Sequence, residues 1–228
     1  LLNDRDRFLQ IVLEEKANEE AAIIPGGHRV VATRLRSRFD IPSWVSEQMR
    51  GIDYLFFLRR LIVEVENDWT SVQQNLEELR SLLFTRNRSY CNVTMSRDLF
   101  PTVREKVGEL LSDLPSSTGT IQQWVPQYLD HNEGLIAPVS VNYVGKAVNL
   151  FDYGYELDGS SMVITRYLGA TWLWDKVRVQ GGAYGAFCSF DSFSGVLTFS
   201  SYRDPNILST LENFDLCAQF LRDLKLSE

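Results

Sequence analysis

A stretch of about 20 residues without hydrophobic periodicity, residues 114–134, divides this 228-residue chain into two parts. It begins with Leu114-Pro115 followed by small polar residues, and regular patterns return only after Gly134. Loops of this length are uncommon inside one compact domain. We therefore predict two partial domains, at residues 1–115 and 135–228, joined by a linker over residues 116–134.

The first part has mostly helical patterns. Apolar residues at helical spacing predict helices over residues 4–24 and 28–39, separated by Pro25-Gly26-Gly27. Asp68-Trp69 is typical of the start of a further helix. Alternating residues 89–95 predict a strand. Ser96 is expected to cap a last helix over residues 98–114.

The second part mixes strands and helices. Four strands are expected, over residues 138–143, 147–151, 183–190 and 195–201. Gly145-Lys146 is expected to separate the first two strands, and a helix is expected to follow Asp158-Gly159-Ser160. Asp204 is expected to cap the final helix. Hairpins mixed with helices in this order predict an α+β fold rather than a doubly wound sheet.

Composition excludes several classes of protein. The net charge of −7 and the pI of about 5.0 argue against a nucleic-acid partner, which would require a basic face. No apolar run reaches the roughly 18 to 20 residues that span a membrane. Cys91, Cys188 and Cys217 offer no disulfide framework, and the last two are expected to be buried thiols.

Metal binding and nucleophilic catalysis find little support in the residues. The two histidines, His28 and His131, lie about a hundred residues apart and cannot form an H-x-x-E-H site, and no C-x-x-C or G-x-S-x-G motif occurs. His28 is expected at the surface or at a helix cap. Four neighbouring arginines are expected to form a solvated face neutralised by the preceding glutamates: Arg29, Arg34, Arg36 and Arg38.

Gly181-Gly182-Ala183-Tyr184-Gly185 is the most unusual stretch. Three glycines around a tyrosine, between a predicted helix and a predicted strand, fit either a tight structural turn or a loop that faces a ligand. Arg178 lies six residues before Tyr184 and could converge on the same ligand. A guanidinium and a phenol both donate hydrogen bonds, which suits a peptide carbonyl or the oxyanion that it becomes.

Several stretches spread over nearly the whole chain carry a family resemblance. They are Gly27-His28, Trp44–Met49 with Gly51 and Tyr54-Leu55, Asp68-Trp69, Val141–Lys146, Thr171–Asp175, Val177–Gly185 and Ser201–Asn206. On these residues the chain closely resembles the presequence protease branch of the pitrilysin-type zinc metallopeptidases, relatives of falcilysin and insulin-degrading enzyme. The resemblance covers only the second half of such enzymes.

The resemblance implies an organisation that the residues alone do not. These enzymes have four α+β domains in two halves that enclose a chamber, with zinc bound in the first domain. Residues 1–115 would belong to the end of the third domain, and residues from 135 to the start of the fourth. The zinc cofactor, the metal ligands and the catalytic residues would then lie in the N-terminal half of the same polypeptide. This chain alone is expected to be inactive.

The resemblance also implies a role and a location. It assigns peptide binding to Arg178 and Tyr184, with Gly181 and Gly182 beside them, and it makes cleaved, Arg-rich targeting peptides the substrates. Residues 116–228 hold 7 basic and 12 acidic side chains, a net charge of −5 that suits such peptides. The protein is expected in the mitochondrial matrix or chloroplast stroma, or in a bacterial cytoplasm. The alternative is a non-catalytic, pitrilysin-fold peptide-binding or scaffold subunit.

Overall fold

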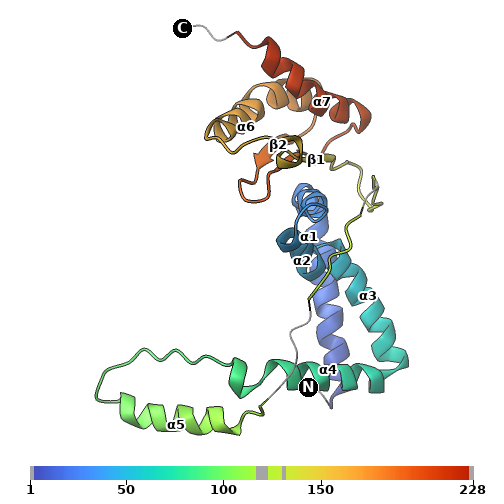
Figure 1. The fold of residues 1–228 in the computed structure, drawn as a ribbon. Helices are drawn as coiled ribbons and strands as arrows, with labels where there is room; N and C mark the ends of the chain where they lie inside the picture. The colour runs from blue at the N-terminus through green and yellow to red at the C-terminus, as the bar shows by residue number, and fades with distance from the viewer. Residues whose placement is uncertain (1–2, 117–122, 130–131, 226–228) are drawn as a thin grey trace. The chain divides into compact units, whose positions relative to one another are not determined.

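The computed structural model describes residues 3–116, 123–129 and 132–225. The chain divides into two compact units. Unit 1 comprises Leu1–Glu14 and Arg60–Val125, and unit 2 comprises Glu15–Arg59 and Pro126–Glu228. Figure 1 shows the elements coloured along the chain. The division into domains at residues 115 and 135 stays a prediction.

Unit 1 is helical in its described residues. It contains the start of α1 (Arg5–Arg36), the end of α3 (Ile52–Asn67), α4 (Trp69–Leu83), the 3₁₀ turn η1 (Arg86–Arg88) and α5 (Phe100–Asp113). The predicted helix start at Asp68 is confirmed, because its carboxylate accepts a hydrogen bond from the Ser71 N–H at 3.2 Å. The Trp69 ring packs on Phe8 with their centroids 5.5 Å apart.

The strand predicted over residues 89–95 is wrong. These residues form no strand, and the Tyr90 side chain is fully exposed. An alternating pattern stabilises a strand only where a partner strand and a buried face are available, and neither exists for this segment among the described residues. The following helix begins at Phe100 with Leu99 as its N-cap, so the cap predicted at Ser96 is also wrong.

Unit 2 is built around a small antiparallel sheet. Besides parts of α1 and α3, its elements are α2 (Ile41–Arg50), β1 (Gly145–Asn149), the 3₁₀ turn η2 (Phe151–Tyr153), α6 (Ser160–Ala170), the π-helix η3 (Trp174–Gln180), β2 (Gly185–Phe190), β3 (Val196–Tyr202) and α7 (Leu208–Asp223). The strand order is β1-β3-β2. Helices on a small antiparallel sheet confirm the α+β fold.

One of the two predicted hairpins is confirmed. β2 pairs with β3 through a turn over residues 191–194. The other is wrong, because Gly145 lies within β1 and opposite Ser200 of β3 instead of at a turn. Of the segment 138–143, only Asn142 makes a β-bridge, and its partner is Asp204. A Cβ at Gly145 would overlap Val31, so the glycine serves helix packing rather than a turn.

The two faces of the sheet are covered by different helices, with α6 and α7 on one side and α1 on the other (Figure 1). The main core lies under α6, η3 and α7 and consists of Val144, Leu168, Leu173, Val177, Ala183, Phe199, Phe214 and Cys217. The opposite face carries Ser200 and Tyr202 on β3, because side chains alternate along a strand. This second face holds the candidate site.

Helix α1 continues through Pro25-Gly26-Gly27, where the sequence predicted its end. A proline inside a helix removes one backbone hydrogen bond. Tertiary packing offsets this loss: both glycines are buried, and a Cβ at Gly27 would overlap the ring of Tyr143. The Tyr143 hydroxyl also donates to the Ile24 carbonyl oxygen. The glycines therefore allow close contact between the helix and the sheet instead of ending the helix.

The predicted solvated basic face is wrong at Arg34, whose side chain is only 11% exposed. Its guanidinium pairs with the carboxylates of Asp53 at 2.7 Å, Glu133 at 2.8 Å and Glu47 at 3.1 Å. Glu47 is fully buried and also accepts from the Ile52 N–H at 2.8 Å, which satisfies the start of α3. Burial raises the pKa of Glu47, and the neighbouring Arg34 opposes that rise.

None of the helices in the described part of the chain has an apolar stretch long enough to cross a lipid bilayer.

We predict that Arg34→Ala lowers the free energy of unfolding by about 3–5 kcal/mol, because it leaves the Glu47 carboxylate buried without its cation. Urea unfolding followed by circular dichroism measures this change. Arg59→Ala is the matched control, since its ion pair with Glu20 is exposed and is worth less than about 1 kcal/mol. Equal losses in the two variants would show that Glu47 is neutral in the folded chain.

Candidate functional site

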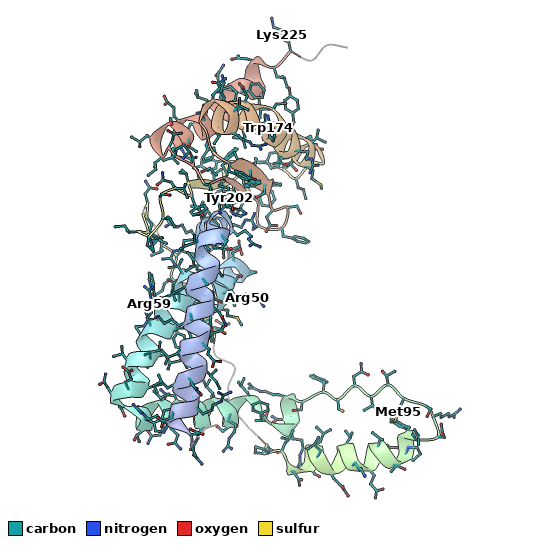
Figure 2. All side chains as sticks on the ribbon, turned by 180° about the vertical axis from the view of Figure 1, so that it is seen from behind. Arg50, Arg59, Met95, Trp174, Tyr202 and Lys225 are labelled. Carbon is teal, nitrogen blue, oxygen red and sulfur yellow. The ribbon has the colours of Figure 1, made fainter. Side chains whose placement is uncertain are left out.

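A pocket of about 470 Å³ in unit 2 brings Arg178 and Tyr184 together. Its wall consists of His28, Trp174, Arg178, Tyr184, Gly185, Ala186, Phe187 and Tyr202. These residues come from α1, η3, the turn before β2, β2 itself and the end of β3. In Figure 2 the labelled Tyr202 lies between α1 and the segment that carries Trp174. The convergence of Arg178 with Tyr184, expected from their spacing, is therefore confirmed as geometry.

Arg178 lies on the π-helix η3, a rare backbone form that occurs often at functional sites. The Arg178 guanidinium carbon lies 3.8 Å from the centroid of the Trp174 ring, in a cation–π contact. No ion pair or hydrogen bond joins this guanidinium to another described residue. Its N–H groups are therefore oriented by stacking while they remain able to donate to a ligand.

The glycines form the turn that ends η3. Gly182 has a φ of +81°, the left-handed conformation that commonly terminates a helix, and its N–H donates to the Arg178 carbonyl at 3.0 Å. A Cβ at Gly181 would lie 2.6 Å from the Val177 carbonyl oxygen. The stretch is thus a tight turn. The residues that follow it, Tyr184 and Gly185, also line the pocket.

Asp204 and Asn206 hold this turn from the neighbouring loop. The Asn206 side-chain amide donates to the Gly181 carbonyl oxygen at 2.6 Å. Asp204 is fully buried and accepts from the Asn206 N–H at 2.9 Å and the Thr210 hydroxyl at 2.7 Å. Because α7 begins only at Leu208, the prediction that Asp204 caps it is wrong. Asp204 instead fixes the loop that holds the turn.

Sequence reasoning missed His28. It was expected at a surface or a cap, but it lies within α1 and packs against the rings of Phe187 and Tyr202. Its burial and the charge of Arg29 lower its pKa. The roles of Trp174 and Tyr202 were missed as well. The signal was present, since all three lie in stretches that carry the family resemblance, but spacing alone could not bring α1 to the sheet.

Metal binding has no counterpart in this pocket. Within residues 3–116, 123–129 and 132–225, no three His, Cys, Asp or Glu side chains cluster as metal ligands. His28 is surrounded by aromatic rings, and His131 lies outside the described residues. Burial raises the pKa values of the Cys188 and Cys217 thiols to about 12, as expected for core residues. The described residues therefore do not fit a zinc ion.

Two family models match separate stretches of the chain. Residues 132–228 match the PreP C-terminal domain, and residues 1–61 match a peptidase-associated region of the same enzymes. The chain is 43% identical over 226 residues to presequence protease 1, chloroplastic/mitochondrial, of Arabidopsis thaliana, and the match covers 99% of this chain and 21% of that protein.

Two further relatives extend the match. Protein HypA of Clostridium perfringens is 33% identical over 227 residues, covering 100% of this chain and 23% of that protein. The mitochondrial presequence protease of Saccharomyces cerevisiae is 26% identical over 229 residues, covering 95% and 23%. The chain thus spans less than a quarter of the length of these relatives. By both family models and by these relatives, the chain belongs to the presequence protease family and represents a C-terminal, peptidase-associated portion of it.

Proposed function

We propose that this chain is the substrate-binding portion of an ATP-independent zinc metalloendopeptidase that degrades cleaved targeting peptides and other short unfolded peptides inside a closed chamber. The observation that carries the proposal is the pocket in which Arg178, stacked on Trp174, lies beside Tyr184. Zinc and its ligands belong, in this proposal, to the N-terminal half of the whole protein. No chemical step at a metal is assigned to this chain.

Arg178 and Tyr184 would hold the peptide by its backbone. A guanidinium offers several N–H donors in one plane, and a phenol offers one O–H donor. Both side chains are accessible from the pocket, and Tyr184 is 67% exposed. Donors fixed in place before the reaction stabilise a carbonyl oxygen more strongly as negative charge develops on it. Arg178 is therefore the residue on which turnover should depend most.

The turn at Gly181-Gly182 would support this function indirectly. It sets the direction in which the chain leaves η3 and so the separation of Arg178 from Tyr184. Small residues there also allow the backbone of an extended peptide to approach closely. A peptide rich in arginine would be attracted by the acidic second part of the chain, with its net charge of −5.

The proposed location rests on the relatives. The names of the Arabidopsis and yeast proteins place them in chloroplasts or mitochondria. We propose the mitochondrial matrix or chloroplast stroma for a eukaryotic source of this chain, and the cytoplasm for a bacterial one.

Cleavage of a fluorogenic targeting peptide tests the proposal. The chain is assayed alone and mixed with a separately expressed, zinc-bearing N-terminal portion completed through any missing segments. Activity only in the mixture is expected. Activity of the chain alone would contradict the assignment of zinc and catalysis to the other half. Inactivity of the mixture, with a chain that circular dichroism shows to be folded, would favour the non-catalytic binding subunit.

Arg178→Ala should reduce turnover in the mixture by roughly 10²-fold, the scale of losing one donor to a developing oxyanion. Arg178→Lys should recover only part of this loss, because an ammonium cannot reproduce the planar guanidinium. Arg166→Ala, which removes the same charge from an exposed position on α6, is the control and should leave turnover unchanged. Unchanged turnover in Arg178→Ala would defeat the assignment of this arginine.

Asn206→Ala should lower kcat/KM by about tenfold, because the Gly181 carbonyl loses its hydrogen bond and the turn no longer fixes Arg178 relative to Tyr184. The stability of the chain should fall by only about 1–2 kcal/mol. Asn213→Ala is the control, since that side-chain amide donates to a carbonyl of its own helix, that of Ser209. A loss of stability without a loss of kcat/KM would confine Asn206 to folding.

A further inference from the structure

His28 connects α1 to the sheet through aromatic rings. Its centroid lies 4.8 Å from that of Tyr202, edge to face, and 5.3 Å from that of Phe187. Contacts of this kind are worth about 0.5–1.5 kcal/mol beyond the area they bury. The His28 side chain is thus held by two strands, although it comes from a helix far earlier in the sequence.

The same chain of rings reaches Tyr184. The Tyr202 ring packs edge to face on Tyr184, with their centroids 5.7 Å apart. The Tyr202 carbonyl also accepts a hydrogen bond from the Tyr184 N–H at 3.0 Å. Since the Tyr184 side chain is largely exposed, Tyr202 is its principal support, and the position of Tyr202 in turn depends on His28.

The surroundings of His28 favour its neutral form. The charged and titratable groups around it are Arg29 on its own helix, Arg178 from η3, and Tyr143, Tyr184, Tyr202 and Arg203 on the sheet side. The His28 Nδ1 atom is buried without a hydrogen-bond partner among the described residues. A proton added to the imidazole would face three arginines and require a new acceptor.

A bound peptide would strengthen this preference. His28 lines the same pocket as Arg178 and Tyr184, so a peptide held there would cover it further. Additional burial disfavours the imidazolium. Burial and Arg29 already lower the pKa of His28, so the packed arrangement is intact at neutral pH and weakens as the pH falls below the ordinary histidine value of about 6.5.

We propose that His28 is a positioning residue for peptide binding: its neutral ring holds Tyr202, which holds Tyr184 against the peptide, and protonation of His28 releases this support. The inference rests on the proposed function, because it assumes that Tyr184 contacts the peptide. It assigns to α1 a role in the site and to the pocket a dependence on pH.

Kinetics of the reconstituted mixture between about pH 5.5 and 8 test the proposal. His28→Ala should raise KM by about two- to tenfold at the upper end of this range, the scale of one lost aromatic contact, with a smaller change in kcat. His28→Phe retains a ring and should keep the KM of the original chain there. It should lose the part of the rise in KM that the original chain shows below about pH 6.5.

A second measurement on the 228-residue chain alone requires no activity. Its two imidazoles give separate proton NMR signals, and His131→Gln assigns them. The rings of Tyr202 and Phe187 should shift the His28 signal upfield, and its titration midpoint should lie below that of His131. Tyr202→Ala should reverse both effects.

Three outcomes would overturn the inference. They are an unchanged KM in His28→Ala, the same acid-side rise in KM for His28→Phe as for the original chain, and a His28 NMR signal without an upfield shift. A failure of the proposed function is distinguishable from these, since unaltered turnover in Arg178→Ala would reject peptide binding at the pocket while the NMR result still decided where His28 lies.

Discussion

Close packing of α1 on the sheet is the contact on which the candidate site depends. The helix approaches because Gly27 leaves room for the Tyr143 ring and because Gly145 leaves room for Val31. A side chain at either position would push the helix away from the strands. With the helix displaced, His28 would lose its contacts with Tyr202, and the pocket would lose one of its walls. Helix packing and site geometry are therefore the same constraint.

Two independent supports then hold the groups that face the pocket. One is polar: Asp204 and Asn206 hold the turn after η3 by hydrogen bonds. The other is aromatic and runs from His28 to Tyr184 through Tyr202. Hydrogen bonds fix the backbone, whereas ring contacts fix side chains whose backbone is already placed. A change in one support should therefore leave the other in place.

Local sequence signals predicted those parts of the fold that depend on neighbours in the chain, whereas features that depend on distant residues were not predictable. The start of α4 after Asp68 and the hairpin of β2 and β3 belong to the first kind, as does the convergence of Arg178 and Tyr184 across a short turn. Pro25-Gly26-Gly27 belongs to the second: it has the composition of a helix end, and only the packing of Tyr143 explains why α1 continues. A sequence pattern records which residues could pair, but tertiary contacts decide which of them do.

The arrangement of the pocket explains why both matched regions of the chain are needed for it. Arg178, Tyr184 and Tyr202 lie in residues 132–228, whereas His28 lies in residues 1–61. The strands alone would leave the polar face of the sheet open to water and Tyr202 free to turn. Since residues 15–59 pack within the same compact unit as the sheet, the peptidase-associated segment acts as the second wall of the pocket. A PreP C-terminal domain separated from that segment would retain its arginine but not the geometry around it.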